Sequence, residues 1–492
     1  PASGAADGAG ERVRVAVVGS GVAGLAAAHA LATAKGERRF EVTIIEAAPA
    51  LGMDAHSVDT YGARSDVPLR VFSRAYYPNL TRLYDQVGVP WHQADYAFSC
   101  SDVSDGAVSR AYFAFRNVMR LGRSVPLPSF RLLLSPSYWH LLVSLLRFFA
   151  VAPAALESGT LKGLTLDEWL QREGYSRAFR DELLYPMLSV VCTCSYDAVG
   201  NYPADVAIDY LAAQHGVSSS QCRAYGGTRD VVKRLSSAVH AVRTGCPVDR
   251  ITPVAGAGGV AGAGGVDVEY VDTKAGGSGR RVTERFDRVV VATQADTALA
   301  MLRGNVSAPL ERALAAVPYE TRSVVVHTDE GLMPPSRDDW RPLNILRRMR
   351  PFDDACCCSV WLNKVDWMLE RDLDRPVFQT WNPWRPAKPD CVVVQSDFQR
   401  PLVTPATAAT AATLSAAQGE RGIHLCGAYV LYSMPLLENG VRSGLQAARA
   451  LGAALDWGCD CQALTCTCFD DGGDARGGAG AEGARSSGGG KG

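Results

Sequence analysis

The stretch AVVGSGVAGLAAAHA, residues 16–30, decides the fold prediction for this chain. It follows the strand-like run Val13–Val18 and places Gly19, Gly21 and Gly24 where a strand would turn into an alanine-rich helix. In this pattern the first glycine allows a tight turn, the second lets the backbone approach a pyrophosphate, and the third lets the helix pack close to the strand. The free N–H groups at the helix start then point at the phosphates. The spacing therefore predicts a dinucleotide-binding loop.

A second strand supports this prediction. The segment FEVTIIEA, residues 40–47, ends its apolar run at Glu46, about 20 residues beyond the glycines, where an acidic side chain accepts hydrogen bonds from a ribose. A carboxylate at this position repels a 2′-phosphate, which disfavours NADP. The alternative is a glycine-rich turn beside a surface glutamate. The order of strand, glycines, helix, strand and acid favours the nucleotide.

The composition is that of an ordinary globular protein. The chain has 492 residues, of which 47% are hydrophobic and 21% charged, and this length suits roughly two or three domains. The 50 Lys and Arg residues nearly cancel the 51 Asp and Glu residues. Net charge therefore does not indicate nucleic acid or an anionic membrane as the main partner.

Cysteine usage and the first residues bear on the compartment. The 14 cysteines form no regular framework through the body of the chain, which favours a reduced intracellular location, cytoplasm or organelle matrix, over secretion. The opening PASGAADGAGER has no apolar core and is not a signal peptide. Because the chain begins at Pro1, a targeting segment could have preceded it.

The nucleotide pattern returns twice along the chain, and this predicts its domain organisation. The helix-like GGTRDVVKRLSSAVHA and the strand-like VRTGCPVDRITPV open the second occurrence, and VDVEYVDT pairs with RVTERFD as a hairpin before the buried strand DRVVVAT. The short strand GIHLCGAY and the helical PLLENGVRSGLQAARALGAAL form the third. The predicted fold is α/β: a Rossmann-type domain assembled from both chain ends, with an inserted α+β substrate domain. The predicted segments are 11–77, 223–317 and 416–458 for the nucleotide domain, 78–222 (mostly helical) and 318–415 for the substrate domain, and 459–492 for a disordered, Gly-rich tail.

One apolar segment, Tyr138–Leu156, has nearly the length of a membrane span. It contains His140, Ser144, Arg147 and Pro153, which makes a transmembrane helix costly. We therefore predict no transmembrane span. The segment is expected to be a helix buried in the substrate domain or a helix that lies peripherally against lipid.

Several motifs in order along the chain together resemble one family. They are VAVVGSGVAGLAAAHAL, VTIIEAAPALG, YYPNLTRLYDQVGVP, TLDEWLQREGYS, VVVATQAD, HTDEGLMP and IHLCGAY, and they extend from residue 13 to about residue 448. The chain resembles the FAD-dependent oxidoreductases of the flavin amine oxidase and phytoene desaturase superfamily. A closer likeness is to the flavin domain associated with cyclopropane fatty acid synthases, here without a methyltransferase half.

The resemblance implies FAD as cofactor and a role for each matching position. The pyrophosphate would be held by Gly19, Ser20, Gly21, Val22, Ala23 and Gly24. Glu46, with Ala47 beside it, would hold the adenine-side ribose, and Val248 would meet the adenine through its backbone. Gly427, Leu437, Glu438 and Val441 would lie near the ribitol and isoalloxazine, although an ordinary strand–helix packing turn is the alternative for this last group.

The sequence also departs from the family pattern. Relatives usually have a second glycine and then a basic residue or His where this chain has Met53 and Asp54, and they tend to have Gly where it has Pro68. These changes either reshape the flavin pocket or weaken it. Arg70 could replace a lost positive contact to phosphate or flavin; a surface arginine in a salt bridge is the alternative.

Two functions follow from these observations. The first is an FAD-dependent oxidoreductase that transfers hydride from an apolar substrate, a lipid or an amine, to the flavin. The second is a non-catalytic flavin-fold partner of a lipid-modifying methyltransferase. A nicotinamide dehydrogenase is a weaker third possibility, which the C-terminal return to the nucleotide domain argues against.

No catalytic residue or metal site is predicted. The chain lacks a G-x-S-x-G elbow and an H-E-x-x-H zinc helix. His327 matches a family motif but is expected to be structural, and Trp361, Trp381 and Trp384 either line an apolar cavity or belong to the core. The cluster CDCQALTCTC, Cys459–Cys468, has thiolate spacing for zinc or copper, but it borders the predicted disordered tail and contains no histidine.

Overall fold

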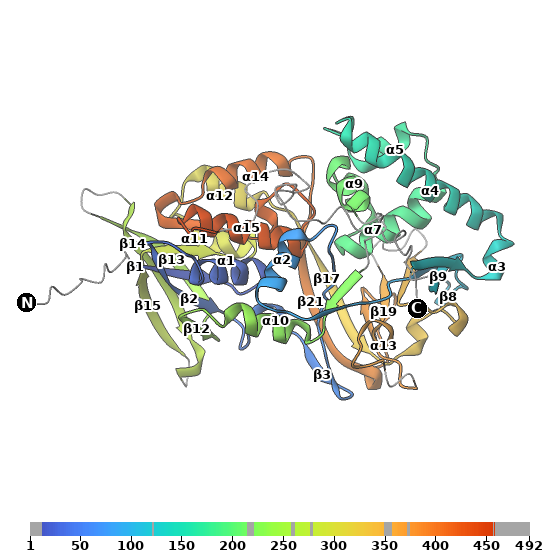
Figure 1. Cartoon of the computed structure of the whole chain (residues 1–492), viewed down its shortest axis with the longest axis horizontal. Coiled ribbons are helices and arrows are strands. Elements are labelled where there is room, and N and C mark those ends of the chain that lie inside the picture. The colour runs from blue at the N-terminus through green and yellow to red at the C-terminus, as the bar shows by residue number, and fades with distance from the viewer. Residues whose placement is uncertain are drawn as a thin grey trace, which may run out of the picture.

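A five-stranded parallel sheet forms the nucleotide-type half of the molecule in the computed structural model (Figure 1). The structure describes residues 12–120, 123–213, 221–256, 261–275, 279–348, 357–370, 374–455 and 457. The sheet order is β12-β2-β1-β16-β22, with every neighbouring pair parallel. Its strands are β1 (Arg12–Val18), β2 (Arg39–Glu46), β12 (Ala241–Thr244), β16 (Arg288–Val291) and β22 (Ile423–Leu425).

This strand order brings the two ends of the chain together. β16 pairs with β1, Val18 opposite Val291, and β22 pairs with β16, Val291 opposite Leu425. Parallel strands buried on both faces read as continuous apolar runs, and Val15, Ala16 and Val17 are fully buried. The predicted fold class, a Rossmann-type domain built from both chain ends with an inserted α+β domain, is confirmed.

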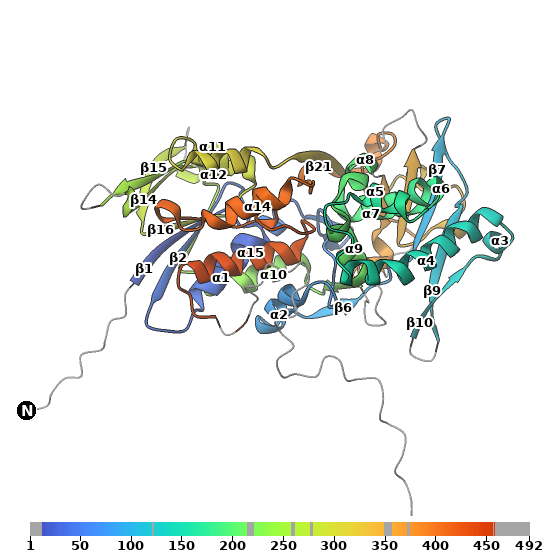
Figure 2. The ribbon, with the colours of Figure 1, turned by 90° about the horizontal axis from the view of Figure 1, so that it is seen from above.

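Two helices pack face to face on this sheet (Figures 1 and 2). They are α1 (Val22–Ala32) and α15 (Leu437–Ala450). Glycines on α15 allow this close approach, because a Cβ at Gly444 would lie 2.4 Å from the Ala23 carbonyl oxygen, and one at Gly440 would lie 2.5 Å from Val22 Cγ1. α15, the last helix of the described residues, thus packs against the first turn of α1.

An antiparallel meander and four further helices complete this half. The segment VRTGCPVDRITPV, expected to be one strand, forms two: β12 joins the parallel sheet and β13 begins the meander, because Gly245, at a φ of +70°, turns the chain between them. The hairpin expected after it is confirmed as β14 paired with β15. The elements are β13 (Val248–Ala255), β14 (Ala261–Asp272), β15 (Arg280–Phe286), α10 (Gly227–Ser236), α11 (Ala295–Leu302), α12 (Ala308–Ala315) and α14 (Thr407–Ala416).

The second half is built on a mixed sheet of order β10-β9-β7-β18-β19-β20-β17-β21, with β8 paired to β7. Residues 78–222 were expected to be mostly helical, yet residues 91–128 supply strands to this sheet and to a smaller one. Residues 98–101, FSCS, alternate between apolar and polar side chains, and this short alternation is the strand signal in the segment. The strands are β7 (Phe98–Ser104), β8 (Ala107–Val108), β9 (Phe113–Arg120), β10 (Arg123–Pro128), β17 (Tyr319–His327), β18 (Leu343–Arg348), β19 (Cys358–Trp361), β20 (Phe378–Trp381) and β21 (Val392–Pro401).

Helices from the middle of the chain cover this sheet at the end of the molecule far from β1 and β2 (Figure 2). They are α3 (Phe130–Leu133), α4 (Pro136–Glu157), α5 (Leu166–Arg172), α6 (Arg177–Phe179), α7 (Tyr185–Cys192), α8 (Tyr196–Asn201) and α9 (Ala204–Ala213). The capping box expected at the start of α5 is present, with Thr165 and Glu168 bonded reciprocally. Among the described residues, α4 alone is long and apolar enough to cross a membrane by length and composition.

Short elements join the two halves. The antiparallel sheet β5-β11-β6 and the hairpin of β3 with β4 lie on this path, as does α2, which follows the nucleotide segment. Their bounds are β3 (Val58–Thr60), β4 (Ala63–Ser65), β5 (Phe72–Ser73), β6 (Trp91–Gln93), β11 (Gln221–Ala224), α2 (Pro78–Gln86) and α13 (Leu362–Val365). The predicted tail from residue 459, with the cluster Cys459–Cys468, lies outside the described residues.

Candidate dinucleotide and substrate site

The glycine loop has the geometry that a dinucleotide requires. Gly19, at a φ of +96°, turns the chain out of β1, and its amide donates to the Ile45 carbonyl of β2 at 2.9 Å. A Cβ at Gly24 would lie 2.1 Å from the Gly19 carbonyl oxygen, so only glycine allows α1 to begin this close to the strand. A Cβ at Gly21, by contrast, would meet no atom within 4 Å. The loop is tight on its inner side and open at the N-terminus of α1, beside Val22 and Ala23, where phosphates bind.

Glu46 is held directly beside this loop. Its Oε2 accepts from both the amide and the hydroxyl of Ser20, at 2.9 and 2.5 Å, and its Oε1 accepts from the Ala48 amide at 2.8 Å. Ser20 Oγ in turn accepts from the Gly52 amide at 2.7 Å. A Cβ at Gly52 would lie 1.8 Å from the Ser20 carbonyl oxygen. Glu46 and the glycine loop are therefore one rigid unit, and Gly52 packs directly against Ser20 of that loop.

The turn between β12 and β13, which lies just before Val248, contacts the end of β2 at Glu46. The Cys246 amide donates to the Glu46 carbonyl and the Gly245 amide donates to the Ala48 carbonyl, both at 2.8 Å. Val248 begins β13 two residues later, and Ala47 is exposed between these contacts. The structure thus brings Glu46, Ala47 and Val248 to one edge of the sheet, as an adenosine site would require.

The C-terminal residues reach the loop from the other side. The Gly427 amide follows β22 and donates to Ser443 Oγ of α15 at 2.9 Å. Leu437 and Val441 lie in the first turns of α15, and Val441 is fully buried. The close contact of Gly440 with Val22 places this part of α15 beside the start of α1. The predicted flavin-side residues therefore adjoin the predicted phosphate-side residues.

Glu438 has a role that sequence reasoning did not foresee. Its buried carboxylate accepts from the Asn79 amide at 3.1 Å, from Asn79 Nδ2 at 2.6 Å and from the Leu80 amide at 3.0 Å. These donors lie at the N-terminus of α2, where unsatisfied N–H groups favour a negative charge. Burial raises the pKa of Glu438, and the three hydrogen bonds oppose that rise. The residue ties α15 to α2.

The unusual Met53 and Asp54 are both accommodated. Met53 is buried in the core. Asp54 accepts from Arg64 Nε at 2.8 Å and Nη2 at 3.0 Å, and Arg229 Nε lies 3.5 Å away. The acid at position 54 therefore lies beside two arginines from neighbouring segments, Arg64 and Arg229.

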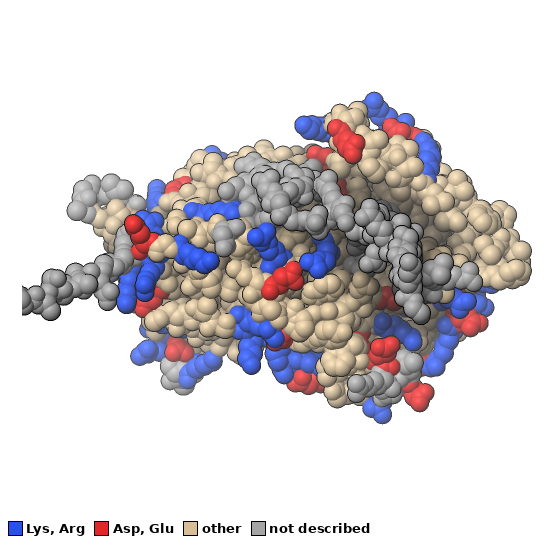
Figure 3. Space-filling view, viewed as in Figure 1, with Lys and Arg blue, Asp and Glu red and all other residues tan. Residues whose placement is uncertain are grey.

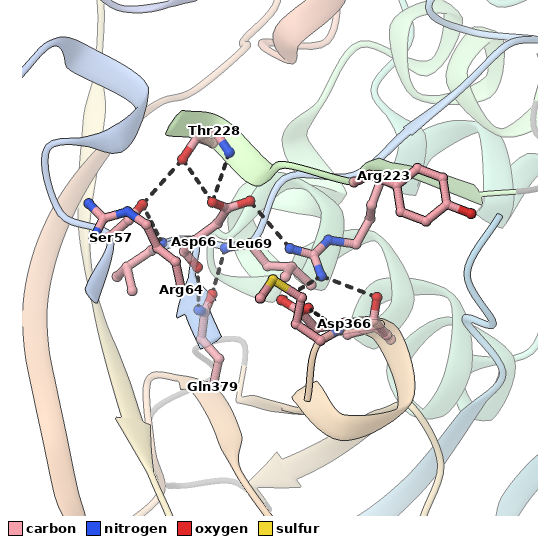
Figure 4. Close-up of polar contacts among 12 residues, drawn as sticks. Ser57, Arg64, Asp66, Leu69, Arg223, Thr228, Asp366 and Gln379 are labelled. Carbon is pink, nitrogen blue, oxygen red and sulfur yellow. Dashed lines mark hydrogen bonds and ion pairs between the residues drawn. The ribbon is translucent and has the colours of Figure 1, made fainter. Parts of the chain in front are cut away.

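The segment around Pro68 is locked by a buried polar network (Figure 4). Asp66 accepts from the Thr228 amide at 2.9 Å, from Thr228 Oγ1 at 2.8 Å and from Arg223 at 3.3 Å. Gln379 of β20 accepts from the Leu69 amide at 2.7 Å and donates to the Asp66 carbonyl at 2.9 Å. The Val67–Pro68 bond is cis. This network fixes the loop between the nucleotide-type half and the substrate-domain sheet.

Arg70 emerges from this loop without a partner. It forms no hydrogen bond or ion pair with the residues that the structure describes, and its Nε is buried. Burial and the charge of Arg400 lower the pKa of Arg70 to about 10. The surface salt bridge considered as its alternative is therefore wrong. Asp66, which acts against this shift, is already bonded to Thr228 and Arg223.

Arg400 is the second cation of this region, and sequence reasoning missed it. It lies on β21, donates from Nε to Thr193 Oγ1 at 2.6 Å and stacks 5.4 Å above the Trp381 ring. Burial lowers its pKa. No local motif marks Arg400, because its neighbours come from distant segments.

The histidine and tryptophan candidates are mostly part of the core. His327 Nδ1 accepts from the Asp329 amide at 3.1 Å and Nε2 bonds Thr380 at 2.7 Å, while burial lowers the His327 pKa to about 4. It is a neutral structural histidine. Trp361 packs edge-on against Trp340 with ring centroids 5.3 Å apart, whereas Trp381 lies under Arg400.

Comparisons with solved structures show the same fold. A CLA-producing fatty acid isomerase from P. acnes matches with a TM-score of 0.59 at 14% identity, over 89% of this chain and 98% of that chain. A putative protoporphyrinogen oxidase from Exiguobacterium sp. 255-15 has a TM-score of 0.59 at 16% identity, with the same coverage. Cyclohexylamine oxidase from Brevibacterium oxydans has a TM-score of 0.57 at 16% identity, over 89% and 98%. No curated protein matches the chain by sequence.

A family model provides the assignment. The model for flavin containing amine oxidoreductase matches residues 22–452, which is most of the chain. This range includes α1, the substrate-domain sheet and α15, all of which the site uses. The chain therefore belongs to the flavin containing amine oxidoreductase family and is an FAD-dependent oxidoreductase.

Proposed function

We propose that this enzyme oxidises an apolar substrate, a lipid rather than an amine, by hydride transfer to FAD. FAD, when bound, supplies the hydride acceptor. The observation that carries the cofactor site is the rigid unit of Ser20, Glu46 and Gly52 around an open Gly21. The proposed FAD-binding residues are those predicted from the sequence: Gly19, Ser20, Gly21, Val22, Ala23, Gly24, Glu46, Ala47, Arg70, Val248, Gly427, Leu437, Glu438 and Val441.

Different residues of the chain would bind different parts of the cofactor and the substrate. The amides at the start of α1 face the phosphates, and Glu46 retains lone pairs for the ribose hydroxyls. Arg70 follows the loop that is bonded to β20 of the substrate-domain sheet, and it would contact the flavin end of an extended cofactor there. Trp381, which is buried, and Phe398 form an apolar ring pair on that sheet, with ring centroids 6.1 Å apart.

Arg70 and Arg400 favour an acidic lipid over an amine. Arg70 and Arg400 are both partly buried, neither is paired with a carboxylate of the described residues, and they repel one another. An incoming anion relieves that repulsion. A protonated amine would add a third positive charge. A carboxylate can accept from an arginine in a bidentate manner, which fixes its orientation.

One visible spectrum of the purified protein tests the cofactor, and anaerobic addition of substrates tests the reaction. We expect a bound flavin that bleaches with an unsaturated fatty acid and not with a primary amine of equal chain length. Bleaching by the amine alone would overturn the substrate assignment. A colourless protein that takes up no FAD but binds a lipid methyltransferase would instead support the non-catalytic partner function.

The compartment is also a proposal. We infer an intracellular location, supported by Cys100, Cys192, Cys246 and Cys426, which are buried free thiols.

A further inference from the structure

The exposed surface of α3 and α4 is unusually apolar. Phe130 is 76% exposed, Leu134 72%, Val143 59%, Leu146 62% and Trp139 45%. We call these five residues the apolar face. Residues 139, 143 and 146 follow helical spacing along one side of α4, and Phe130 and Leu134 extend the same strip across α3. Figure 3 shows the corresponding end of the molecule as a broad area with few charged side chains.

The opposite side of α4 packs against the protein core. Tyr138, Leu141, Phe148 and Ala152 are buried, and Phe148 packs edge-on against Trp169 with ring centroids 5.8 Å apart. A helix that crosses a bilayer would have to withdraw this inner side from the core. α4 is therefore apolar on both sides, with one side packed and the other presented to the surroundings.

A hydrogen bond between α3 and α4 fixes the position of Trp139 in the apolar face. Trp139 Nε1 donates to the Leu133 carbonyl at 2.8 Å, which satisfies a backbone acceptor at the end of α3 and fixes the ring between the two helices. An indole with a bonded N–H and an exposed apolar ring is the kind of side chain found at membrane–water boundaries.

Basic side chains outnumber acidic side chains near the apolar face. Between Asp105 and Glu157 the sequence contains six arginines and neither Asp nor Glu. Arg110 and Arg131, with side chains 48% and 46% exposed, share the single buried carboxylate of Asp339. Nearby, Asp338 is exposed, and Arg337 is paired with Glu330. Arg116 on β9 is exposed as well. The surplus charge beside the apolar face is positive.

We propose that the apolar face docks on an anionic lipid bilayer, with Phe130, Leu134 and Trp139 inserted below the headgroups and the arginines paired with lipid phosphates. Apolar insertion and electrostatic attraction together are what stable peripheral binding needs. A second copy of the chain fits less well, because a two-fold contact would place two surfaces with the same surplus of positive charge against each other. The proposal goes beyond the proposed reaction and uses none of its residues.

Vesicle flotation of the full-length holoenzyme tests the proposal. We expect binding to vesicles of phosphatidylcholine with phosphatidylglycerol, weaker binding to phosphatidylcholine alone, and loss of binding in high salt. The double variant Phe130→Ser/Leu134→Ser should bind the anionic vesicles at least about tenfold more weakly. The matched control is Val242→Ser/Val392→Ser, because these side chains are 43% and 37% exposed elsewhere on the molecule and should leave binding unchanged.

Three results would overturn the proposal. The first is that the wild-type protein floats with neither kind of vesicle. The second is that the Phe130→Ser/Leu134→Ser variant floats as well as the wild type. The third is that the wild type forms a concentration-dependent dimer, which this variant abolishes, and binds no vesicles. Quenching of Trp139 by brominated lipid, lost in Trp139→Phe, locates the inserted side without relying on the double variant. Flavin content and melting temperature report whether each variant is folded, so failure here is distinguishable from failure of the FAD site.

Discussion

The amide and the hydroxyl of Ser20 both donate to one carboxylate oxygen of Glu46, at 2.9 and 2.5 Å. This pair joins the turn after β1 to the end of β2, and so the proposed ribose-binding acid is aligned by the proposed phosphate-binding loop itself. The second Glu46 oxygen accepts only the Ala48 amide among the described residues, which leaves lone pairs available to a ligand.

Replacing Glu46 with Gln should weaken FAD more than it destabilises the fold. An amide carries no charge. When its oxygen accepts the two Ser20 donors, its NH₂ group faces the Ala48 amide and cannot accept from a ribose hydroxyl, so FAD affinity should fall about tenfold to a hundredfold. Titration of the apoprotein with FAD, followed by flavin fluorescence, measures the change. Glu37→Gln, at an exposed position, is the matched control. Equal FAD affinity in the two variants would contradict the ribose-binding role.

Two glycines of the same loop should respond in opposite ways to alanine. Gly24→Ala places a Cβ 2.1 Å from the Gly19 carbonyl oxygen and should lower the free energy of unfolding by roughly 1–3 kcal/mol or more. Gly21→Ala meets no protein atom and should change the unfolding free energy by less than about 1 kcal/mol while reducing FAD affinity about tenfold. Denaturant unfolding of the apoproteins and FAD titration separate the two effects. A Gly21→Ala variant with unchanged flavin affinity would show that its open space is not the cofactor site.

Arg70 and Arg400 should control the choice between acidic and basic substrates. Arg400→Gln removes one of two unneutralised cations and should weaken binding of a fatty acid about tenfold or more with flavin content preserved. Arg70→Gln should do the same and also lower FAD affinity modestly, because Arg70 is a proposed cofactor contact. Fatty acid binding is measured by perturbation of the flavin spectrum. Arg82→Gln, on an outward position of α2, is the control. Unaltered fatty acid binding in both variants would remove the basis for an acidic substrate.

Asp329 should make the protein sensitive to acid. Desolvation would raise its pKa, but hydrogen bonds from Arg385, at 2.8 Å, and from the amides of Lys388 and Gly331 outweigh it and lower the pKa to about 2. Because the folded-state pKa lies below the unfolded value, the stabilisation is present above the ordinary carboxyl pKa and is lost as pH falls through about 2. Asp329→Asn should therefore cost about 1–2 kcal/mol at pH 7 and progressively less below pH 4. Urea unfolding across pH 7 to 3 measures this, with exposed Asp390→Asn as the control. A cost that is equal at pH 7 and pH 3 would contradict the assignment.

Short-range pattern was enough to predict the cofactor loop. Gly19, Gly21, Gly24 and Glu46 lie on adjacent elements whose geometry follows from the turn and the two strands, so their spacing alone predicts their arrangement. The same holds for buried β16 and β22, which read as apolar runs. Local pattern was less informative for β7 and β9, because their short apolar–polar alternation lies beside long helical segments. It also did not show that the segment VRTGCPVDRITPV is divided into β12 and β13.

Sequence alone therefore predicted the Rossmann-type half and its dinucleotide loop, because strand, turn and helix preferences act over a few residues, and the family resemblance added FAD. Only tertiary structure decided that Glu438 is bonded to Asn79, that Arg70 lies near Arg400 with no carboxylate of the described residues as partner, and that α4 packs one apolar side and exposes the other. Each of these depends on contacts between segments far apart in the chain. Such contacts are set by how helices and sheets pack around a common core, and no local spacing of residues records them.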